Sequence, residues 1–277
     1  MTQPDRAPAD AALEALRNGR AGRPVMTSLT VDEAILLDQV GYEPLGMVTG
    51  ASVVRVGQLG RWATAYNENG EVESLSQAST HARRTAVANL VREAQSLGAD
   101  GVVSVGTDAG EFGTEGNLVH MVVTGTAVRL ADPKLRRSGS GSRSHEGCFT
   151  AAMNGQAVHL LSRAGYAPLG IVSGVCAYHV GRRAFSSWAS SVKQNQEMSI
   201  YTEALYDARE LAMSRLQDES LAHGADGVIG LNVTERAGIW GSHVIEFAAL
   251  GTAVRLVGQH QALSPRMLMD LASDTSG

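Results

Sequence analysis

GADGV stands at residues 98–102 and returns unchanged at residues 224–228. Two other blocks recur in the same order: GYEPLG (41–46) becomes GYAPLG (165–170), and GTAVRL (125–130) is repeated at 251–256. Three matched blocks in one order indicate two copies of a single module. Because such a repeat is one supersecondary unit, it decides the fold class of the whole chain.

The spacing of the two copies identifies a loop. The first block is displaced by 124 positions (166 minus 42), and the later blocks by 126 positions (226 minus 100). The second copy therefore carries two extra residues, between the counterparts of Gly57 and Trp62, where it reads 182–187. Loops tolerate changes of length, so a loop is predicted there. From Trp62 and Trp188 onward the copies align without a gap.

Each copy is predicted to start with a short helix and a bent strand. In the first copy, Thr30 and Glu33 are spaced as a capping box for a helix over 30–39. The Val-rich stretch 45–56 contains two glycines, which favours a strand with a bend or bulge.

A long helix and two more strands complete the predicted module. Residues 73–97, with counterpart 199–223, contain neither Pro nor Gly and predict a helix. Strands are predicted over 101–107 and 118–130, joined by a Gly-rich hairpin connection over 108–117. The order strand, helix, strand, strand predicts a two-layer α+β unit with an antiparallel sheet.

Small residues are expected to bring helix and sheet close together. At about 100° per residue, a single stripe runs along the helix. It consists of Ala78, Ala82, Ala86 and Leu90. The turn after the helix is also predicted in both copies: Gly98 and Gly224 stand where a left-handed cap is favoured. Asp100 and Asp226 are expected to hydrogen-bond the turn backbone.

Composition limits the classes of function. The 277 residues are 44% hydrophobic with a net charge of −5, so a globular protein is expected and a nucleic-acid partner is not. Two cysteines are too few for a disulfide scaffold. Without a membrane-length apolar segment, a cytoplasmic protein that does not insert into membranes is expected. The predicted divisions are a disordered or weakly helical N-terminal tail (1–25), module one (26–130), a Ser/Gly/Arg-rich linker (131–147), module two (148–257) and a C-terminal tail (258–277).

Several of these motifs resemble those of the YbjQ-like family. They are LGADGVV at 97–103, GTAV at 125–128, and VTG at 48–50 with its echo VSG at 172–174. The family consists of small bacterial proteins described as putative heavy-metal-binding. The resemblance implies a β-α-β-β module, like the dodecin subunit, that assembles with itself into five-fold rings. A ring of five modules cannot be built from whole two-module chains, so five chains with ten modules, for example as two stacked rings, are expected.

The resemblance raises the question of which residues could bind a transition or heavy metal ion. Glu93 and its counterpart Glu219 are the first candidates, because Glu93 is predicted to lie on the packed alanine face. A buried carboxylate is costly unless it is bonded. Three roles are therefore open for Glu93. It could bind a metal or another ligand, form a structural ion pair with Arg83 or Arg129, or extend its carboxylate to the end of the helix.

Weaker metal candidates are scattered and not duplicated. His145 and Cys148 have a chelating spacing but form no closed site on their own. His120 and Glu246 occupy equivalent positions and could contribute to a site between subunits. Cys176 and His179 lie three apart on a predicted strand, so their side chains are expected to point to opposite faces.

No enzyme signature supports a catalytic site. The sequence lacks a Walker A motif, a strand-linked G-x-G-x-x-G motif, H-E-x-x-H and a G-x-S-x-G elbow. The leading hypothesis is a non-catalytic, homo-oligomeric binding or scaffold protein. The alternatives are a metal binder with sites between subunits and a small-molecule enzyme with a site between modules.

Overall fold

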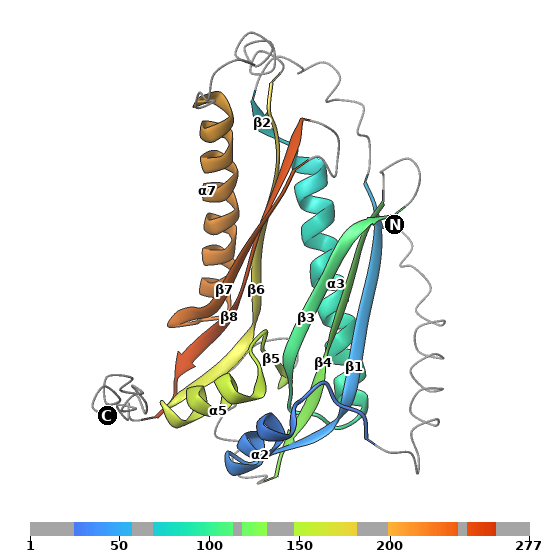
Figure 1. The fold of residues 1–277 in the computed structure, drawn as a ribbon, viewed down its shortest axis with the longest axis vertical. Helices are drawn as coiled ribbons and strands as arrows, with labels where there is room; N and C mark the ends of the chain where they lie inside the picture. The colour runs from blue at the N-terminus through green and yellow to red at the C-terminus, as the bar shows by residue number, and fades with distance from the viewer. Residues whose placement is uncertain are drawn as a thin grey trace, which may run out of the picture.

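The computed structural model describes residues 25–56, 69–112, 118–131, 147–181, 199–237 and 243–258. In these ranges the chain forms two four-stranded sheets, each with a long helix against one face (Figure 1). The predicted α+β class and the tandem β-α-β-β modules are confirmed. The predicted Trp62 loop, its counterpart and the linker lie outside the described residues.

The first module follows the predicted order of elements. These are α2 (Val31–Gln39), β1 (Tyr42–Arg55), α3 (Glu73–Ser96), β3 (Gly101–Phe112) and β4 (Leu118–Leu130). Its sheet has the order β1-β4-β3-β5, and β4 pairs antiparallel with both β1 and β3.

The second module repeats this arrangement. Its elements are α5 (Gly155–Arg163), β6 (Tyr166–His179), α7 (Ser199–Ala222), β7 (Gly227–Ala237) and β8 (Val244–Leu256). Its sheet has the order β2-β6-β8-β7, so β7 ends the sheet among the described strands. No helix in the described ranges is long and apolar enough to cross a membrane.

Local sequence explains several of these boundaries. Thr30 and Glu33 form the predicted capping box at the start of α2. The register of β1 shifts between Pro44 and Gly46, which confirms the predicted bulge. Pro44 is tolerated because β1 is an edge strand, where a missing ladder donor costs little. Gly98 has φ +73°, the left-handed conformation expected of a helix cap.

Two predicted boundaries were wrong. β1 begins at Tyr42, three residues before the expected start, because its pairing with β4 reaches Leu130. β3 continues to Phe112, so the hairpin connection is shorter than the predicted 108–117. Backbone pairing with β4 holds this extension although its Gly and Asp residues are poor strand formers.

Two short strands are exchanged between the modules. β2 (Gly70–Glu71) precedes α3 of the first module but pairs with β6 of the second. β5 (Phe149–Thr150) precedes α5 of the second module but runs parallel to β3 of the first. Each module therefore adds a strand to the sheet of the other, so the two sheets are joined by backbone pairing.

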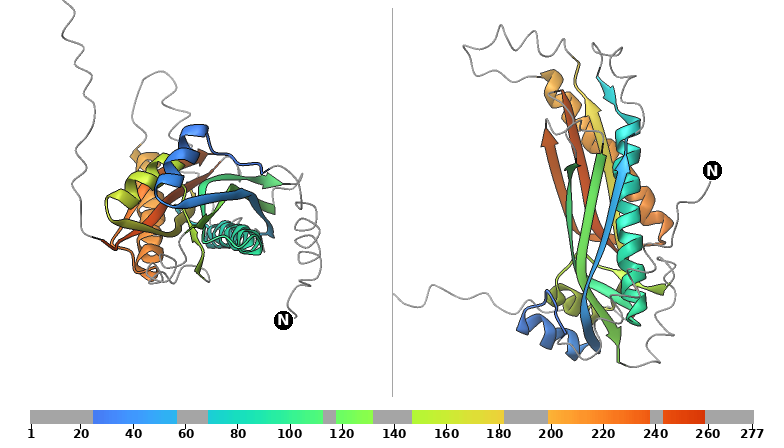
Figure 2. Two further views of the ribbon diagram at one scale, coloured as in Figure 1. Left: turned by 90° about the horizontal axis from the view of Figure 1, so that it is seen from below. Right: turned by 90° about the vertical axis from the view of Figure 1, so that its right-hand side faces the viewer.

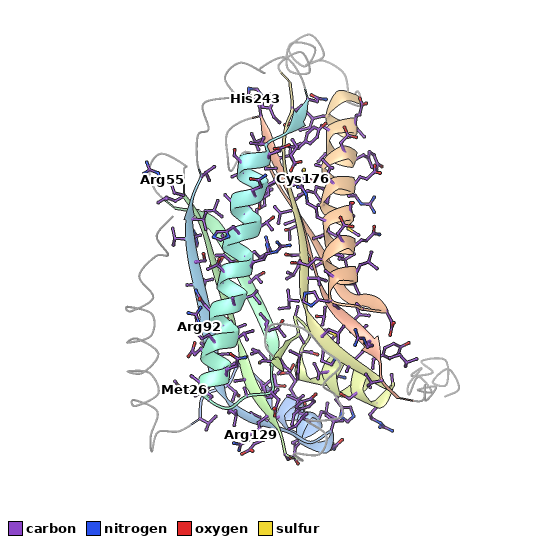
Figure 3. All side chains as sticks on the ribbon, turned by 180° about the vertical axis from the view of Figure 1, so that it is seen from behind. Met26, Arg55, Arg92, Arg129, Cys176 and His243 are labelled. Carbon is purple, nitrogen blue, oxygen red and sulfur yellow. The ribbon has the colours of Figure 1, made fainter. Side chains whose placement is uncertain are left out.

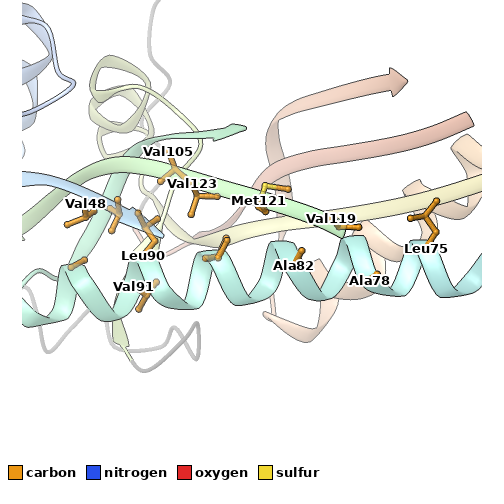
Figure 4. Close-up of a cluster of buried hydrophobic side chains, with 14 of the residues drawn as sticks. Val48, Leu75, Ala78, Ala82, Leu90, Val91, Val105, Val119, Met121 and Val123 are labelled. Carbon is orange, nitrogen blue, oxygen red and sulfur yellow. The ribbon is translucent and has the colours of Figure 1, made fainter. Parts of the chain in front are cut away.

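The first core lies between α3 and its sheet (Figure 4). The predicted alanine stripe is buried, with Ala82 and Ala86 at 0% exposure. Gly50 shows how close the contact is, since a Cβ atom there would overlap the carbonyl oxygen of Ala86. Gly174 has the same relation to Ala212 in the second module. Small residues on the helix and glycine on the strand thus permit backbone contact between the two layers.

Candidate functional site at the module interface

Beside its contact with its own sheet, α3 also packs on β6 of the second module (Figure 1). Two serines of α3 make the polar contacts at the middle of this interface. Ser76 Oγ accepts a hydrogen bond from the Ala177 backbone N–H at 2.9 Å, and Ser79 Oγ donates to Glu246 Oε2 at 3.4 Å. These serines were not singled out from the sequence, because hydroxyls on a predicted helix face usually signal solvent.

Apolar contacts extend the interface at both ends. Near the start of α3, Val72 and Leu75 share a buried cluster with Ala177 and Val244 of the second module. At the other end of the sheets α2 lies against α5, as Figure 2 shows. There His159 Nδ1 lies 2.7 Å from the carbonyl oxygen of Leu36.

An ion pair links the exchanged strand β2 to α7. Arg215 Nη1 and Nη2 donate to the two carboxylate oxygens of Glu71 at 2.6 and 2.8 Å, and Nη1 also donates to the Val175 carbonyl at 2.7 Å. Burial raises the pKa of Glu71, but hydrogen bonds from Arg215 and Ser76 and the charge of Arg215 lower it more, so the net pKa falls. The hydrogen bond to Glu71 raises the pKa of Arg215. The pair is therefore fully ionised at neutral pH.

A second arginine is enclosed at the interface. Arg83 of α3, whose counterpart in the second copy is Arg209, is 7% exposed, and its Nε atom has no hydrogen-bond partner among the residues that the structure describes. Burial lowers its pKa, while the charge of Glu246 opposes this effect. Arg236 of β7 donates to the Ala109 carbonyl in the first module. Glu246 thus supplies a negative charge to an interface that contains two arginines.

A groove of about 840 Å³ lies where α3 and α7 diverge. It is lined mainly by polar side chains of both helices. These include Gln77, Thr80, His81, Arg84, Asp218 and His223. Arg84 Nε pairs with Glu219 Oε1 at 3.0 Å across this groove. Both signs of charge line the groove, and Arg84 and Arg215 are each paired with a glutamate, so it shows no preference for ligands of one charge.

The primary metal candidates Glu93 and Glu219 have matching structural contacts. Glu93 Oε2 accepts a hydrogen bond from the Thr49 N–H at 2.7 Å, and Glu219 Oε2 accepts one from the Ser173 N–H at 2.6 Å. Each carboxylate thus fixes the strand beside its helix. Arg129, considered as a partner for Glu93, instead pairs with Glu43 at 2.7 Å.

The weaker candidates do not come together in the described part of one chain. Cys148 and Cys176 are free and buried, and Cys176 lies on β6 (Figure 3). Burial raises the pKa of each thiol to about 12, so neither is a thiolate at neutral pH. His120 lies on β4, and Glu246 on β8 is 5% exposed, whereas His145 lies outside the described residues. No group of three or more His, Cys, Asp or Glu residues that could hold a metal ion occurs among the residues described.

The donor groups in the described part of a single chain therefore do not fit a soft metal, which requires thiolate and imidazole ligands at one point. The turn aspartates act on the backbone: Asp100 Oδ2 accepts from Leu130 N–H and Asp226 Oδ2 from Leu256 N–H, each at 2.8 Å. They join the helix–strand turn to the end of the following strand.

Equivalent surfaces of the two modules differ in exposure: a surface that is buried between the modules in one copy is exposed in the other. On β6, Val175 and Ala177 are buried under α3, at 1% and 0% exposure. Their counterparts on β1 are Ala51 and Val53; Ala51 is exposed, and Val53 is 61% exposed. On the helices, Arg83 is 7% exposed, whereas its counterpart Arg209 is exposed. The same positions are covered in one module and uncovered in the other.

Many of the large exposed hydrophobic residues belong to these two uncovered faces. The outer face of the first module carries Val25, Met26, Val31, Ile35, Met47 and Val53. The outer face of the second carries Leu160, Tyr206, Leu231 and Leu256. We call these surfaces the β1 face and the α7 face. They are the counterparts of the two halves of the internal interface.

The chain is similar to proteins with one and with two such modules. Encapsulin nanocompartment protein Rv1762c of Mycobacterium tuberculosis is 33% identical over 257 residues, covering 93% of this chain and 95% of that protein. A UPF0145 protein of Psychromonas ingrahamii is 41% identical over 90 residues, covering 32% of this chain and 82% of that protein. A UPF0145 protein of Thermotoga maritima is 39% identical over 93 residues, covering 32% and 81% respectively.

The family model described as putative heavy-metal-binding matches residues 37–131 and 164–257. The two matches cover one module each and together span more than half of the chain. With two tandem copies of its module, the chain belongs to the YbjQ family.

Proposed function

We propose that the protein is a non-catalytic, homo-oligomeric scaffold in which chains join head to tail. The observation that carries this proposal is that each module uses only one of its two interface surfaces within the chain. Module one presents α3 to β6 of module two, while the equivalent β1 face and α7 face remain uncovered at the two ends of the chain.

The type of interface predicts how chains assemble. The two surfaces in contact are different, so the interface is heterologous, and repeating it produces a closed ring or an open filament. Exposed apolar patches of this kind are typical of protein–protein contacts. Within a ring, the α7 face of each chain would cover the β1 face of the next. In a single chain each module has a neighbouring module on one side only. In the ring every module would have a neighbour on both sides.

The proposed number of chains comes from the five-fold rings that the family resemblance implies. Whole chains supply an even number of modules, and five chains with ten modules remain the proposed assembly. The two modules of one chain would be consecutive in such a ring, because they are already joined by the internal interface.

The proposed biological setting comes from the full-length relative. Because that relative is called an encapsulin nanocompartment protein and matches over 95% of its own length, we propose that this chain also serves in such a compartment. A scaffold that assembles with itself fits a compartment. A cytoplasmic location belongs to the same proposal.

Native mass spectrometry of the full chain tests the assembly, with Val53→Asp as the disrupting variant. Val53 corresponds to the buried Ala177, so a charge there would be buried against α7 of the next chain. Val257→Asp is the matched control. Val257 is 60% exposed and its counterpart Ala131 is exposed although the internal interface is formed. We expect a closed oligomer for the wild type and the control, and smaller species for Val53→Asp. A monomeric wild type would refute the proposal.

The family description favours metal binding as a second candidate function, and we propose that its sites would lie between subunits. Elemental analysis of the same oligomer tests it, together with the double variant Glu93→Gln and Glu219→Gln. Stoichiometric metal that disappears in this variant would support the second candidate, and unchanged metal content would argue against these carboxylates. A small-molecule enzyme remains the third candidate, and turnover in a substrate screen would favour it over the scaffold.

A further inference from the structure

The edge of β3 is covered by β5, and the hydrogen bonds of this contact are regular. Phe149 N–H donates to the Asp100 carbonyl at 3.1 Å, and Ala151 N–H donates to the Val102 carbonyl at 2.8 Å. In return, Val105 N–H donates to the Ala151 carbonyl at 3.0 Å. The second module thus contributes a parallel strand to the first sheet before its own helix α5 begins.

Burial confirms that this contact excludes water. The strand residues Val102 and Val103 are at 0% exposure, and so is Ala151 on the added segment. Gly101 lies directly under the ring of Phe149, where a Cβ atom would overlap the ring. The absence of a side chain at residue 101 therefore leaves room for the added strand.

The counterpart edge of the second sheet has no covering strand in the described part of the chain. β7 ends its sheet among the described strands, and a Cβ atom added at Gly227, the counterpart of Gly101, would meet nothing within 4 Å. Leu231, the counterpart of the buried Val105, is 46% exposed. This edge has the same place in its module as the covered one, but no described strand covers it.

The segment that would cover it is present at the other end of the chain. Residues 25–29 correspond to residues 149–153, and Val25 and Met26 are 63% and 76% exposed. Met26 lies on the side of the first module that faces away from the second (Figure 3). An open edge and an exposed extended segment are therefore displayed on opposite faces of one chain.

The exposed segment is already held in the required position. Ser28 N–H donates to Thr126 Oγ1 at 3.2 Å, and its counterpart Ala152 N–H donates to Thr252 Oγ1 at 3.1 Å. Met47 N–H also donates to the Met26 carbonyl at 2.7 Å. Each segment is thus attached to its own module by the same threonine contact. A neighbouring copy therefore presents the segment without further folding.

We propose that residues 25–29 of one copy add as a parallel strand to the β7 edge of the next copy. Val25 lies opposite Gly227 and Met26 opposite Val228, as Phe149 and Thr150 lie opposite Gly101 and Val102. Val25 N–H donates to the Asp226 carbonyl, and Thr27 N–H donates to the Val228 carbonyl. Strand addition of this kind satisfies an edge that otherwise invites unspecific pairing. The proposal rests on the proposed head-to-tail assembly and specifies one of its contacts.

A cysteine crosslink tests the register. Val25→Cys and Gly227→Cys in one chain place two thiols on directly opposed residues, within the distance range that a disulfide needs. We expect mild oxidation to convert the assembled protein into a ladder of covalent multimers on non-reducing gels. Val25→Cys with Val257→Cys is the control pair and should give no ladder. An assembled double variant that gives none, or in which the thiol introduced at residue 227 stays open to a maleimide probe, overturns the proposal. If the thiol at residue 227 is protected from the maleimide probe but no crosslink forms, another segment occupies the β7 edge, and this result also overturns the proposal.

A second pair of variants tests the backbone contact. Thr27→Pro removes the N–H that donates to Val228, whereas Thr27→Ala keeps it. We expect the chain concentration at which half of the oligomer dissociates to rise at least tenfold for Thr27→Pro and to stay within twofold for Thr27→Ala. Equal dissociation of both variants overturns the strand addition while the oligomer itself still supports the proposed scaffold. A wild type that is monomeric refutes both proposals.

Discussion

Replacement of Arg215 by Asn tests the ion pair that joins the two modules. The first module provides the precedent for this change, because Asn89 occupies the position of Arg215 there. Asn89 Nδ2 donates to the Ala51 carbonyl at 2.8 Å, just as Arg215 donates to the Val175 carbonyl at 2.7 Å. Arg215→Asn therefore keeps the contact to the strand and removes the two bonds to Glu71.

The expected loss in free energy of unfolding has two parts. The side chain of Arg215 is 37% exposed, so solvent screening limits the ion pair itself to about 1 kcal/mol. Glu71 is only 16% exposed, and leaving this carboxylate without its partner adds about 1 kcal/mol. The total is about 2 kcal/mol at pH 7. The additional substitution Glu71→Gln should restore about half of it.

The loss depends on pH in a defined direction. The pKa of Glu71 in the folded protein lies below its ordinary value, so its ionised form stabilises the fold at pH values above the ordinary glutamate pKa. This stabilisation disappears as the pH falls through the lowered pKa. The difference between wild type and Arg215→Asn should therefore be complete at neutral pH and shrink at about pH 3.

Urea unfolding followed by far-ultraviolet circular dichroism measures the effect at one fixed chain concentration. With an m-value of about 3 kcal/mol/M, the midpoint of Arg215→Asn should fall by about 0.7 M at pH 7. Arg92→Asn, at an exposed arginine of α3, is the matched control and should move it little. An equal loss at both pH values, or no recovery with Glu71→Gln, would contradict the reasoning.

Three more predictions follow from burial. Leu75→Ala, at 0% exposure where α3 meets the second module, should cost about 2–5 kcal/mol in urea unfolding; a loss below about 1 kcal/mol would show that the site collapses around the cavity. Gly174→Ala would place a methyl group against the carbonyl oxygen of Ala212 and should cost about 1–3 kcal/mol, whereas a neutral result would mean that α7 moves away from β6 without penalty. Because burial raises the pKa of Cys176 to about 12, iodoacetamide at pH 8 should modify it only after denaturation; mass spectrometry that finds rapid modification of the folded protein would disprove this.

The candidate site shows where reasoning from the sequence reached its limit. Glu93 was correctly placed on the packed helix face, but the strand groups that the carboxylates of Glu93 and Glu219 bind, at Thr49 and Ser173, are backbone N–H groups. Helical periodicity tells which face a side chain occupies. It cannot tell which strand backbone lies opposite, because that depends on how β1 crosses α3 in three dimensions.

The interface itself could not be predicted from the repeat. The duplication predicts two equivalent modules, and the structure shows that their surroundings differ. Ser76 and Ser79 are buried only because the second module covers them, at 2% and 4% exposure. Nothing in the identity of a serine on a helix indicates such a covering, so no sequence signal would have selected them.

The duplicated β-α-β-β module, its caps and its alanine-lined helix could all be predicted from the sequence. These features depend on local backbone preference and on the spacing of small and apolar residues, both of which can be read directly from the sequence. The exchange of β2 and β5 between the sheets and the exposure of the β1 and α7 faces became apparent only in the folded structure. Such contacts join residues far apart in the chain, and their geometry is set by how two already folded surfaces fit together.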